Sequence, residues 1–228
     1  METPQTTVVT FTGTLWSGIE DIYAKVVAHP FITGLLDGTL PRESFRHYVI
    51  QDAHYLRGYA RTLAVCAARA TTDEDTVMFA RHAGNTVVVE RELHESLLAE
   101  MGTTPDQAVA EPIGPTTRAY LDFLAVTAVT GSFAESVGAV LPCYWIYARV
   151  GELLRAHGSP DPLYHRWINA YGDDAFQGIV EEVLGVADRL GERLGAEDRL
   201  LVGERMRTAA RYEWMFWDAA FRHESWPV

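Results

Sequence analysis

The sequence is short of cysteine, of basic residues and of long apolar runs, and each shortage excludes a class of protein. Only two cysteines occur in 228 residues, which is too few for a disulfide framework, and they do not form the CxxC pair typical of zinc sites. Lys and Arg number 19 against 31 Asp and Glu, for a formal net charge of -12. No basic run supplies the electrostatic surface that binds a phosphate backbone, so we expect no nucleic-acid partner.

The apolar segments are interrupted by Glu, Arg or Gly well before the roughly 18 residues that a membrane-spanning helix needs. The N-terminal segment METPQTTVVTFTG has neither the basic region nor the apolar core of a signal peptide. These two absences predict a soluble, cytoplasmic protein that has no membrane partner.

What the sequence does contain is the composition of an ordinary globular protein. Hydrophobic residues make up 48% of the chain and charged residues 22%, which is enough for a substantial core inside a water-exposed surface. One large domain is the simplest organisation at this length. We therefore expect a single domain over residues 1–228, with residues 1–12 as a polar N-terminal arm.

Apolar residues recur at spacings of three and four along most of the chain, which is the periodicity of amphipathic helices. No segment alternates with period two between hairpin turns, and neither GxGxxG nor GxxxxGK(S/T) occurs, so Rossmann and P-loop folds have no support. The predicted class is all-α, a helical bundle. Helices are expected over about residues 15–29, 41–70, 72–102, 117–130, 133–157, 162–170, 174–194 and 196–221, with loops over 30–40 and 103–116.

Cys143 is the better of the two candidate nucleophiles. It lies in the segment LPCYWIY beside Tyr144 and Trp145, an aromatic setting that can stack a flat ring. Tyr147, four residues on, falls on the same helical face, where its phenol could donate to the sulfur or to a substrate. The plainer alternative is a small buried core residue, and this is the interpretation that we adopt for Cys66 in AVCAARA.

Two carboxylates occupy apolar helix faces, where a charge needs a partner or a purpose. Asp52 shares its face with several tyrosines, and Glu213 lies among the aromatic residues of RYEWMFW. A carboxyl group desolvated among aromatic rings can have its pKa raised towards neutral, which suits a general acid. The alternative for each carboxylate is a structural hydrogen bond to a buried tyrosine or arginine.

The eight histidines do not form the Glu-x-x-His pattern that holds di-iron sites in helical bundles. Glu43 and His47 are four residues apart, as are Glu90 and His94, but such charge-rich stretches are typical of solvated helix faces. His29 directly precedes a proline, which predicts a helix end rather than a haem ligand. We therefore expect no metal and no haem.

Four ordered blocks with a common resemblance span nearly the whole chain. They are HPFITGLLDGTLPRESFRHYVIQDAHYLRGYA at 29–60, GSFAESVGAVLPCYWIYARVGE at 131–152, WINAYGDDAF at 167–176 and YEWMFWDAAFRHESW at 212–226. Together they resemble the thiaminase II proteins, also called the TenA family, which have a haem oxygenase-like helical fold. With Cys143 present, the resemblance is to the cysteine-containing branch of that family.

The resemblance implies a catalytic role for three residues. Cys143 would add to a pyrimidine ring so that the substituent on the exocyclic methylene leaves and water replaces it. Glu213 would be the acid-base group, and Asp52 would bind the ring nitrogen or amino group. The residues that would bind the substrate are the polar tyrosines Tyr55, Tyr147 and Tyr171, and the aromatic residues Tyr120 and Phe216 that sandwich the ring.

The resemblance also implies a reaction and an assembly. Family members hydrolyse aminomethylpyrimidine to hydroxymethylpyrimidine in thiamin salvage, or cleave thiamin itself, without a cofactor and as homotetramers. His54 occupies a position where the family often has an aromatic residue. Two alternatives stay open: a non-catalytic pyrimidine-binding or regulatory protein of the same fold, and an oxidoreductase related to its cofactor-synthesising or haem-degrading members.

Overall fold

The computed structural model describes residues 10–228, except for the side chains of residues 89–92. Every regular element in this range is a helix, so the predicted all-α class is confirmed. The helices are α1 (Phe11–Ser17), α2 (Glu20–Val27), α3 (Pro30–Asp37), α4 (Arg42–Arg69), α5 (Asp73–Glu100), α6 (Pro105–Ala110), α7 (Pro115–Thr130), α8 (Phe133–His157), α9 (Pro162–Gly172), α10 (Asp174–Arg193) and α11 (Ala196–Phe221).

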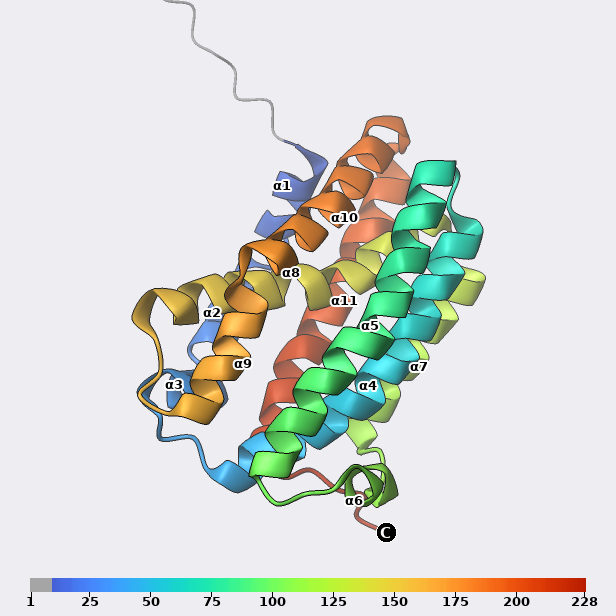
Figure 1. Cartoon of the computed structure of the whole chain (residues 1–228). Helices are drawn as coiled ribbons and strands as arrows, with labels where there is room; N and C mark the ends of the chain where they lie inside the picture. Colours follow the sequence, from blue (N-terminus) through green and yellow to red (C-terminus); the bar gives the residue numbers. More distant parts are fainter. Residues whose placement is uncertain (1–9) are drawn as a thin grey trace, which may run out of the picture.

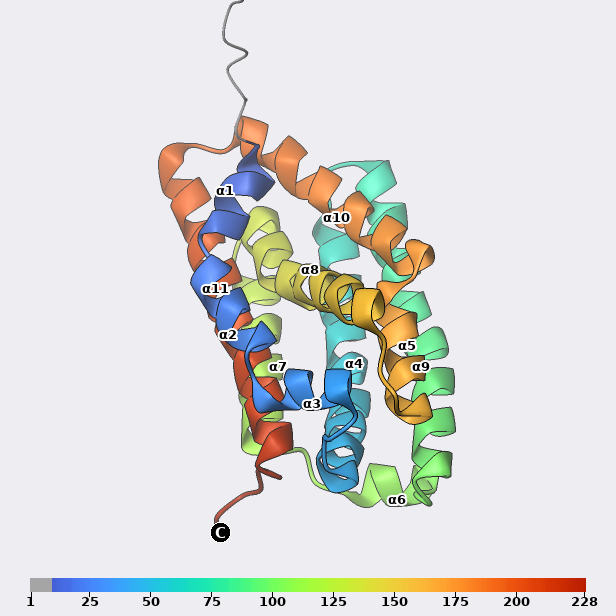
Figure 2. The same ribbon diagram turned by 90° about the vertical axis from the view of Figure 1, so that its left-hand side faces the viewer.

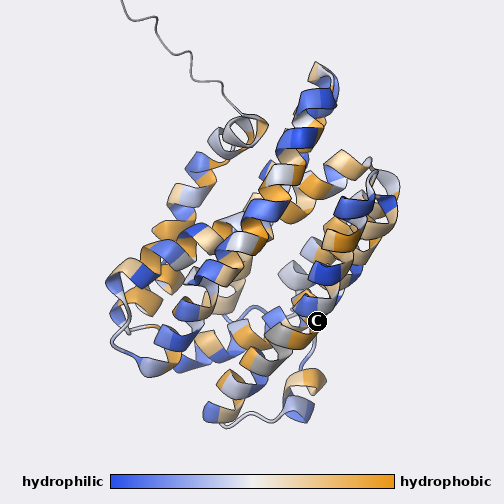
Figure 3. Ribbon diagram, turned by 45° about the horizontal axis from the view of Figure 1, so that its top comes forward, coloured by the Kyte–Doolittle hydropathy of each residue, from blue (hydrophilic) through white to orange (hydrophobic). Residues whose placement is uncertain are grey.

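Helix α8 passes through the middle of the bundle (Figures 1 and 2). It contacts α4, α7, α9, α10 and α11, while α4 and α5 form a long antiparallel pair beside it. Polar and apolar residues are interspersed along the helices (Figure 3). Because α8 is covered by so many neighbours, side chains near its centre are held inside the protein.

Two long helices near the C-terminus were predicted accurately, and the ends of the first carry strong local signals. The helix predicted over 133–157 is α8, which begins with a capping box between Ser132 and Glu135 and ends at Gly158, whose φ is 70°. The helix predicted over 196–221 is α11. None of the helices over residues 10–228 combines the length and apolar character that crossing a membrane requires.

The prediction of one helix over 15–29 followed by a loop over 30–40 is wrong. The segment forms α1 and α2, and α1 begins at Phe11, inside the stretch expected to be a polar arm; residues 1–9 lie outside the described range. His29 and Pro30 begin a third helix, because the His29 side chain accepts a hydrogen bond from the Phe31 backbone N–H and Pro30 takes the first helical position. His29 therefore lies at the start of a helix, not at the end of the preceding one as predicted.

The expected loop over 103–116 also contains a helix, α6. Thr104 and Gln107 form a capping box, and Pro105 occupies the first turn, where its missing N–H has no cost. One of the prolines that predicted a loop, Pro105, thus marks the start of a short helix.

Candidate active site

A small inner cavity of about 40 Å³ lies beside the centre of α8. Side chains from α4, α5, α8, α9 and α10 line it. They are Asp52, Leu56, Tyr59, Thr86, Cys143, Tyr144, Tyr147, Tyr171 and Phe176. Four of the eight residues singled out from the sequence therefore face one buried space.

The other four singled-out residues lie directly behind this cavity, on α4, α7 and α11. The ring of Tyr55 has its centroid 5.0 Å from that of Tyr120 and 5.6 Å from that of Phe216. The Tyr120 hydroxyl donates a 2.6 Å hydrogen bond to Oε1 of Glu213. All four side chains are buried, so the structure brings the eight residues together in one cluster.

Cys143 is half-buried because its thiol faces the inner cavity. Burial raises the pKa of this thiol well above its ordinary value, and the nearby carboxyl groups of Glu213 and Asp52 raise it further when they carry a charge. The hydroxyls of Tyr55 and Tyr59 oppose this shift by favouring the thiolate. The resting residue is therefore a neutral thiol, and only the thiolate form of cysteine is strongly nucleophilic. Cys66, by contrast, is fully buried in the core, as predicted.

Glu213 is only 1% exposed. Burial raises the pKa of its carboxyl group to about 8, with a further contribution from the charge of Asp52, while the hydrogen bond from Tyr120 lowers it. The group is therefore mostly protonated at neutral pH. A protonated, buried carboxyl group has the property that a general acid requires.

Asp52 is 2% exposed and lies on the face of α4 that packs against α5. Its Oδ2 is 2.9 Å from Nε2 of His94, which is 3% exposed. The prediction that His94 lies on a solvated face is wrong, because the buried stripe of α5 also includes Phe79, His82 and Leu97 at helical spacing. The helical spacing of these residues in the sequence was the signal that could have predicted the burial of His94. Of the other predicted solvated residues, Glu43 is exposed and His47 half-buried, while the side chain of Glu90 lies outside the described part.

Tyr59 and Tyr144 were not among the predicted site residues, although Tyr144 was noted as an aromatic neighbour of Cys143 and both line the inner cavity. The Tyr59 hydroxyl donates to the carbonyl of Val140, 2.9 Å away. The Tyr144 hydroxyl is 3.1 Å from Nδ1 of His82, whose Nε2 is 2.9 Å from Oε2 of Glu182. A polar chain therefore leads from the surface of α10 to the cavity. No spacing rule predicts it, because its members come from three helices.

An outer cavity of about 260 Å³ adjoins the inner one. The two share the walls formed by Thr86, Tyr144, Tyr171 and Phe176. Its additional polar lining comes from His82, Asn85 and Asp173. A ligand that reaches Cys143 therefore has room to extend towards α10.

Tyr147 and Tyr171 are held by close packing around α8. The Tyr48 hydroxyl donates to the Tyr147 hydroxyl at 3.1 Å, and the rings of Tyr147 and Tyr171 are 5.1 Å apart. Gly151 makes this arrangement possible, because a Cβ there would lie 2.4 Å from the carbonyl oxygen of Tyr171. The glycine thus sets how closely α9 approaches α8.

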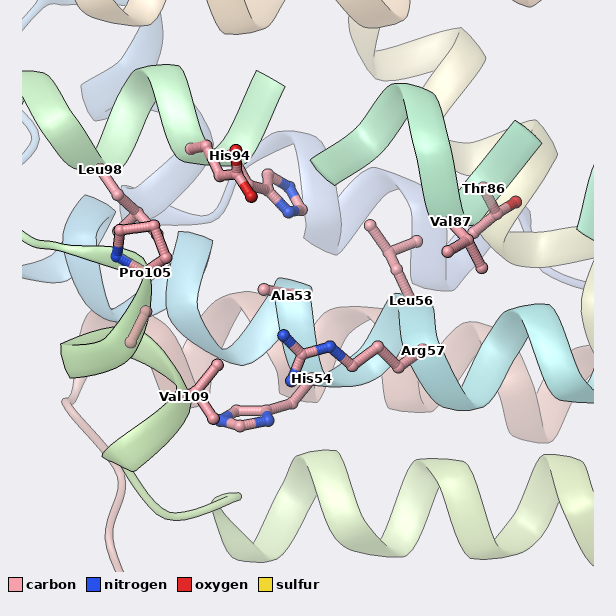
Figure 4. A pocket seen from close by; sticks show the side chains of 12 residues that line it. Ala53, His54, Leu56, Arg57, Thr86, Val87, His94, Leu98, Pro105 and Val109 are labelled. Carbon is pink, nitrogen blue, oxygen red and sulfur yellow. The ribbon is translucent and has the colours of Figure 1, made fainter. Parts of the chain in front are cut away.

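His54 does not line the inner cavity. It lines a lateral cavity of about 200 Å³ between α4, α5 and α6, with Arg57 and Val109 (Figure 4). Its Nε2 is 2.9 Å from the carbonyl oxygen of Glu111. In the described part of the chain, no three His, Cys, Asp or Glu side chains are grouped as metal ligands.

Comparisons with known proteins show the family of the chain. The chain matches the TENA/THI-4/PQQC family over residues 16–223. It is 36% identical over 198 residues to an aminopyrimidine aminohydrolase of Bacillus subtilis (strain 168), a match that covers 87% of this chain and 84% of that protein.

Solved structures show the same fold. A TenA homologue from P. horikoshii OT3 superposes with a TM-score of 0.87 at 31% identity, covering 94% of this chain and 99% of that one. A Shewanella denitrificans domain of unknown function with a haem oxygenase-like fold superposes with a TM-score of 0.73 at 16% identity, covering 95% and 94%. The chain has the haem oxygenase-like fold and belongs to the TENA/THI-4/PQQC family.

Proposed function

We propose that the chain is an aminopyrimidine aminohydrolase of thiamin salvage, with Cys143 as its nucleophile. The observation that supports this most strongly is the inner cavity, where Cys143 and Asp52 face one space and the protonated carboxyl of Glu213 lies behind it. A relative named as an aminopyrimidine aminohydrolase supports the same reaction class. The substrate is aminomethylpyrimidine, and thiamin is a second substrate.

The reaction begins with addition of the Cys143 sulfur to a carbon of the pyrimidine ring, while the thiol proton passes to a ring nitrogen. Electrons pushed from this adduct expel the exocyclic amine, which takes its proton from Glu213. Water then adds to the exocyclic methylene and returns a proton to Glu213, and the sulfur leaves with the ring-nitrogen proton restored to it. In the net reaction, water replaces the amine with a hydroxyl group, ammonia is released, and the enzyme returns to its starting state.

Asp52 accepts hydrogen bonds from the aminopyrimidine edge and stabilises the positive charge that develops on the adduct. Tyr120 and Phe216 contact the faces of the ring, and Tyr55, Tyr147 and Tyr171 contact its polar atoms. The inner cavity of about 40 Å³ is small for a substituted ring. Binding therefore requires these aromatic side chains to rotate, with the leaving group directed into the outer cavity of about 260 Å³.

One observation favours the alternative, a pyrimidine-binding or regulatory protein without turnover. The pKa of the Cys143 thiol is raised well above its ordinary value, and a neutral thiol is a weak nucleophile. In this alternative the pocket is retained and the chemistry is lost. In either case we expect a homotetramer in the cytoplasm, as in the thiaminase II proteins that the chain resembles.

A product assay separates these functions. The purified chain is incubated with aminomethylpyrimidine and, separately, with thiamin, and hydroxymethylpyrimidine is measured by chromatography. Faster conversion of the aminopyrimidine identifies a salvage hydrolase, and comparable thiamin cleavage identifies a thiaminase. Tight pyrimidine binding without product from either compound supports the non-catalytic alternative.

The two cysteines form a matched pair of variants for this assay. Cys143→Ala should abolish turnover and keep the helical circular dichroism, because only the thiol in the cavity is lost. Cys66→Ala removes a thiol of the same size from the core and should keep turnover within about threefold, because only packing is changed. Full activity in Cys143→Ala removes the thiol from the mechanism.

A further inference from the structure

The buried pair of Asp52 and His94 joins the two longest neighbouring helices, α4 and α5, immediately behind the inner cavity. Asp52 lines that cavity, whereas His94 is not among the side chains that face it. The mechanism above uses Asp52 and leaves His94 without a role. Both side chains are almost completely buried, so the pairing is an internal feature of the bundle rather than a surface contact.

A carboxylate that is 2% exposed is costly to bury unless another group compensates its charge. Among the described residues, His94 is the only ion-pair partner of Asp52. Nε2 and Oδ2 are 2.9 Å apart, without the alignment of a linear hydrogen bond. The contact therefore restrains one carboxylate oxygen and leaves Oδ1 as the oxygen that is free to face a ligand.

The far side of His94 faces a different space. Its side chain lines the lateral cavity between α4, α5 and α6, together with Leu56 and Leu98 (Figure 4). The imidazole thus separates this cavity from the site, and it reaches a bound pyrimidine only through Asp52. That placement makes it a group that orients a neighbour, not one that touches the substrate.

The second buried histidine of α5, His82, does not pair with Asp52. Its carboxylate partner is Glu182 on α10 rather than a residue of the inner cavity. Of the two buried histidines on α5, His82 therefore lines the outer cavity and His94 contacts Asp52.

We propose that His94 is a positioning residue that holds Oδ2 of Asp52, so that Oδ1 meets the amino group and ring nitrogen of an aminopyrimidine. The proposal rests on the function proposed above and adds to it the residue that fixes how the ring is oriented. Without His94 the carboxylate would rotate, and the ring would bind more weakly and in the wrong orientation for attack by Cys143.

Three variants test this role. His94→Gln keeps an N–H at the reach of Nε2, His94→Asn keeps an amide that is too short to reach Asp52, and His94→Leu removes all polarity. A matched control is His29→Gln, since His29 is also buried and its Nε2 is 3.5 Å from Oδ1 of Asp218, away from every cavity wall described above. For each protein, kcat and KM are measured with aminomethylpyrimidine, and the Kd of hydroxymethylpyrimidine is measured by calorimetry.

We expect His94→Leu and His94→Asn to lower kcat/KM and to weaken product binding by roughly 10- to 100-fold, the range for a lost contact to a charged group. His94→Gln should retain both values within about threefold, and His29→Gln should leave both unchanged. Equal losses in the Gln and Asn variants overturn the proposal, as does wild-type behaviour in both Asn and Leu. If His94→Leu does not fold, the comparison of His94→Gln with His94→Asn still tests the proposal.

The two readouts separate this proposal from the proposed function. If the wild-type chain binds hydroxymethylpyrimidine but releases no product from aminomethylpyrimidine, the hydrolase assignment fails, and the Kd series still tests His94. If the wild-type chain neither binds nor converts a pyrimidine, both proposals are overturned.

Discussion

The hydroxyl of Tyr120 on α7 donates a 2.6 Å hydrogen bond to Oε1 of Glu213 on α11. Two opposing effects meet at this carboxyl group, because burial raises its pKa and the Tyr120 hydrogen bond lowers it, leaving a value of about 8. The hydrogen bond from Tyr120 therefore limits how far the pKa of Glu213 rises above neutral pH. It also ties together two helices that each carry an aromatic residue of the candidate site.

Replacing Tyr120 by Phe should raise the pKa of Glu213 further, because the interaction that stabilises its ionised form is lost. Activity that needs the protonated acid falls as pH rises through this pKa, so the alkaline limb of the kcat/KM profile should move upward by roughly one to two pH units. Tyr212→Phe is the control, since Tyr212 stacks on the Tyr120 ring, 5.1 Å away, and is only half-buried. An alkaline limb that stays in place would show that Glu213 is not the titrating acid.

Glu213→Gln should make stability less dependent on pH. The folded-state pKa of about 8 lies above the ordinary 4.5, so the stability contributed by the protonated carboxyl is complete below pH 4.5 and is lost as pH rises towards 8. In the wild type this group lowers the free energy of unfolding by up to roughly 1.4 kcal/mol per pH unit in that window. Glutamine does not ionise. The free energy of unfolding, measured by urea denaturation at several pH values between 4.5 and 8, should therefore vary less with pH in Glu213→Gln than in the wild type. Parallel curves for the two proteins would contradict the raised pKa.

Gly151→Ala should displace α9 from α8. The new Cβ would lie 2.4 Å from the carbonyl oxygen of Tyr171, a backbone atom that cannot move aside alone. We expect a loss of about 1–3 kcal/mol in the free energy of unfolding and a higher KM, because Tyr171 moves with its helix. Gly84→Ala on α5 is the matched control, since nothing lies within 4 Å of its added Cβ, and it should be neutral or stabilising by up to about 1 kcal/mol. Equal stability of the two variants would refute the close-approach argument.

Arg69→Met should destabilise the chain without changing the chemistry of the site. The Arg69 guanidinium at the end of α4 donates to the carbonyls of Ala128, Val129 and Gly131 at the end of α7, at 2.6, 2.9 and 2.5 Å. Its loss leaves these carbonyls to water, at a cost of about 1–3 kcal/mol in thermal or urea unfolding. Arg61→Met, on an exposed turn of the same helix, should change stability by less than about 0.5 kcal/mol. If Arg69→Met and Arg61→Met have the same Tm, the hydrogen bonds from Arg69 to the end of α7 do not stabilise the chain.

Some parts of this structure follow from local sequence alone. The long helices α8 and α11 were predicted closely from their apolar spacing, and the ends of α8 are also marked by a capping box and a terminal glycine. The same local patterns were misread where a short helix begins at a proline, as at Pro30 and Pro105, because proline both ends one helix and starts another.

The sequence by itself determined the all-helical class and picked out Asp52 and Glu213, since a carboxylate on an apolar face is visible from spacing alone. Only the tertiary structure decided what those groups contact. The packing of α4 against α5 placed His94 next to Asp52 instead of in solvent, and the meeting of α7 with α11 gave Glu213 both its burial and its tyrosine partner. Periodicity reports which side of a helix is buried, whereas a pKa or an ion pair depends on the distance to atoms from another helix.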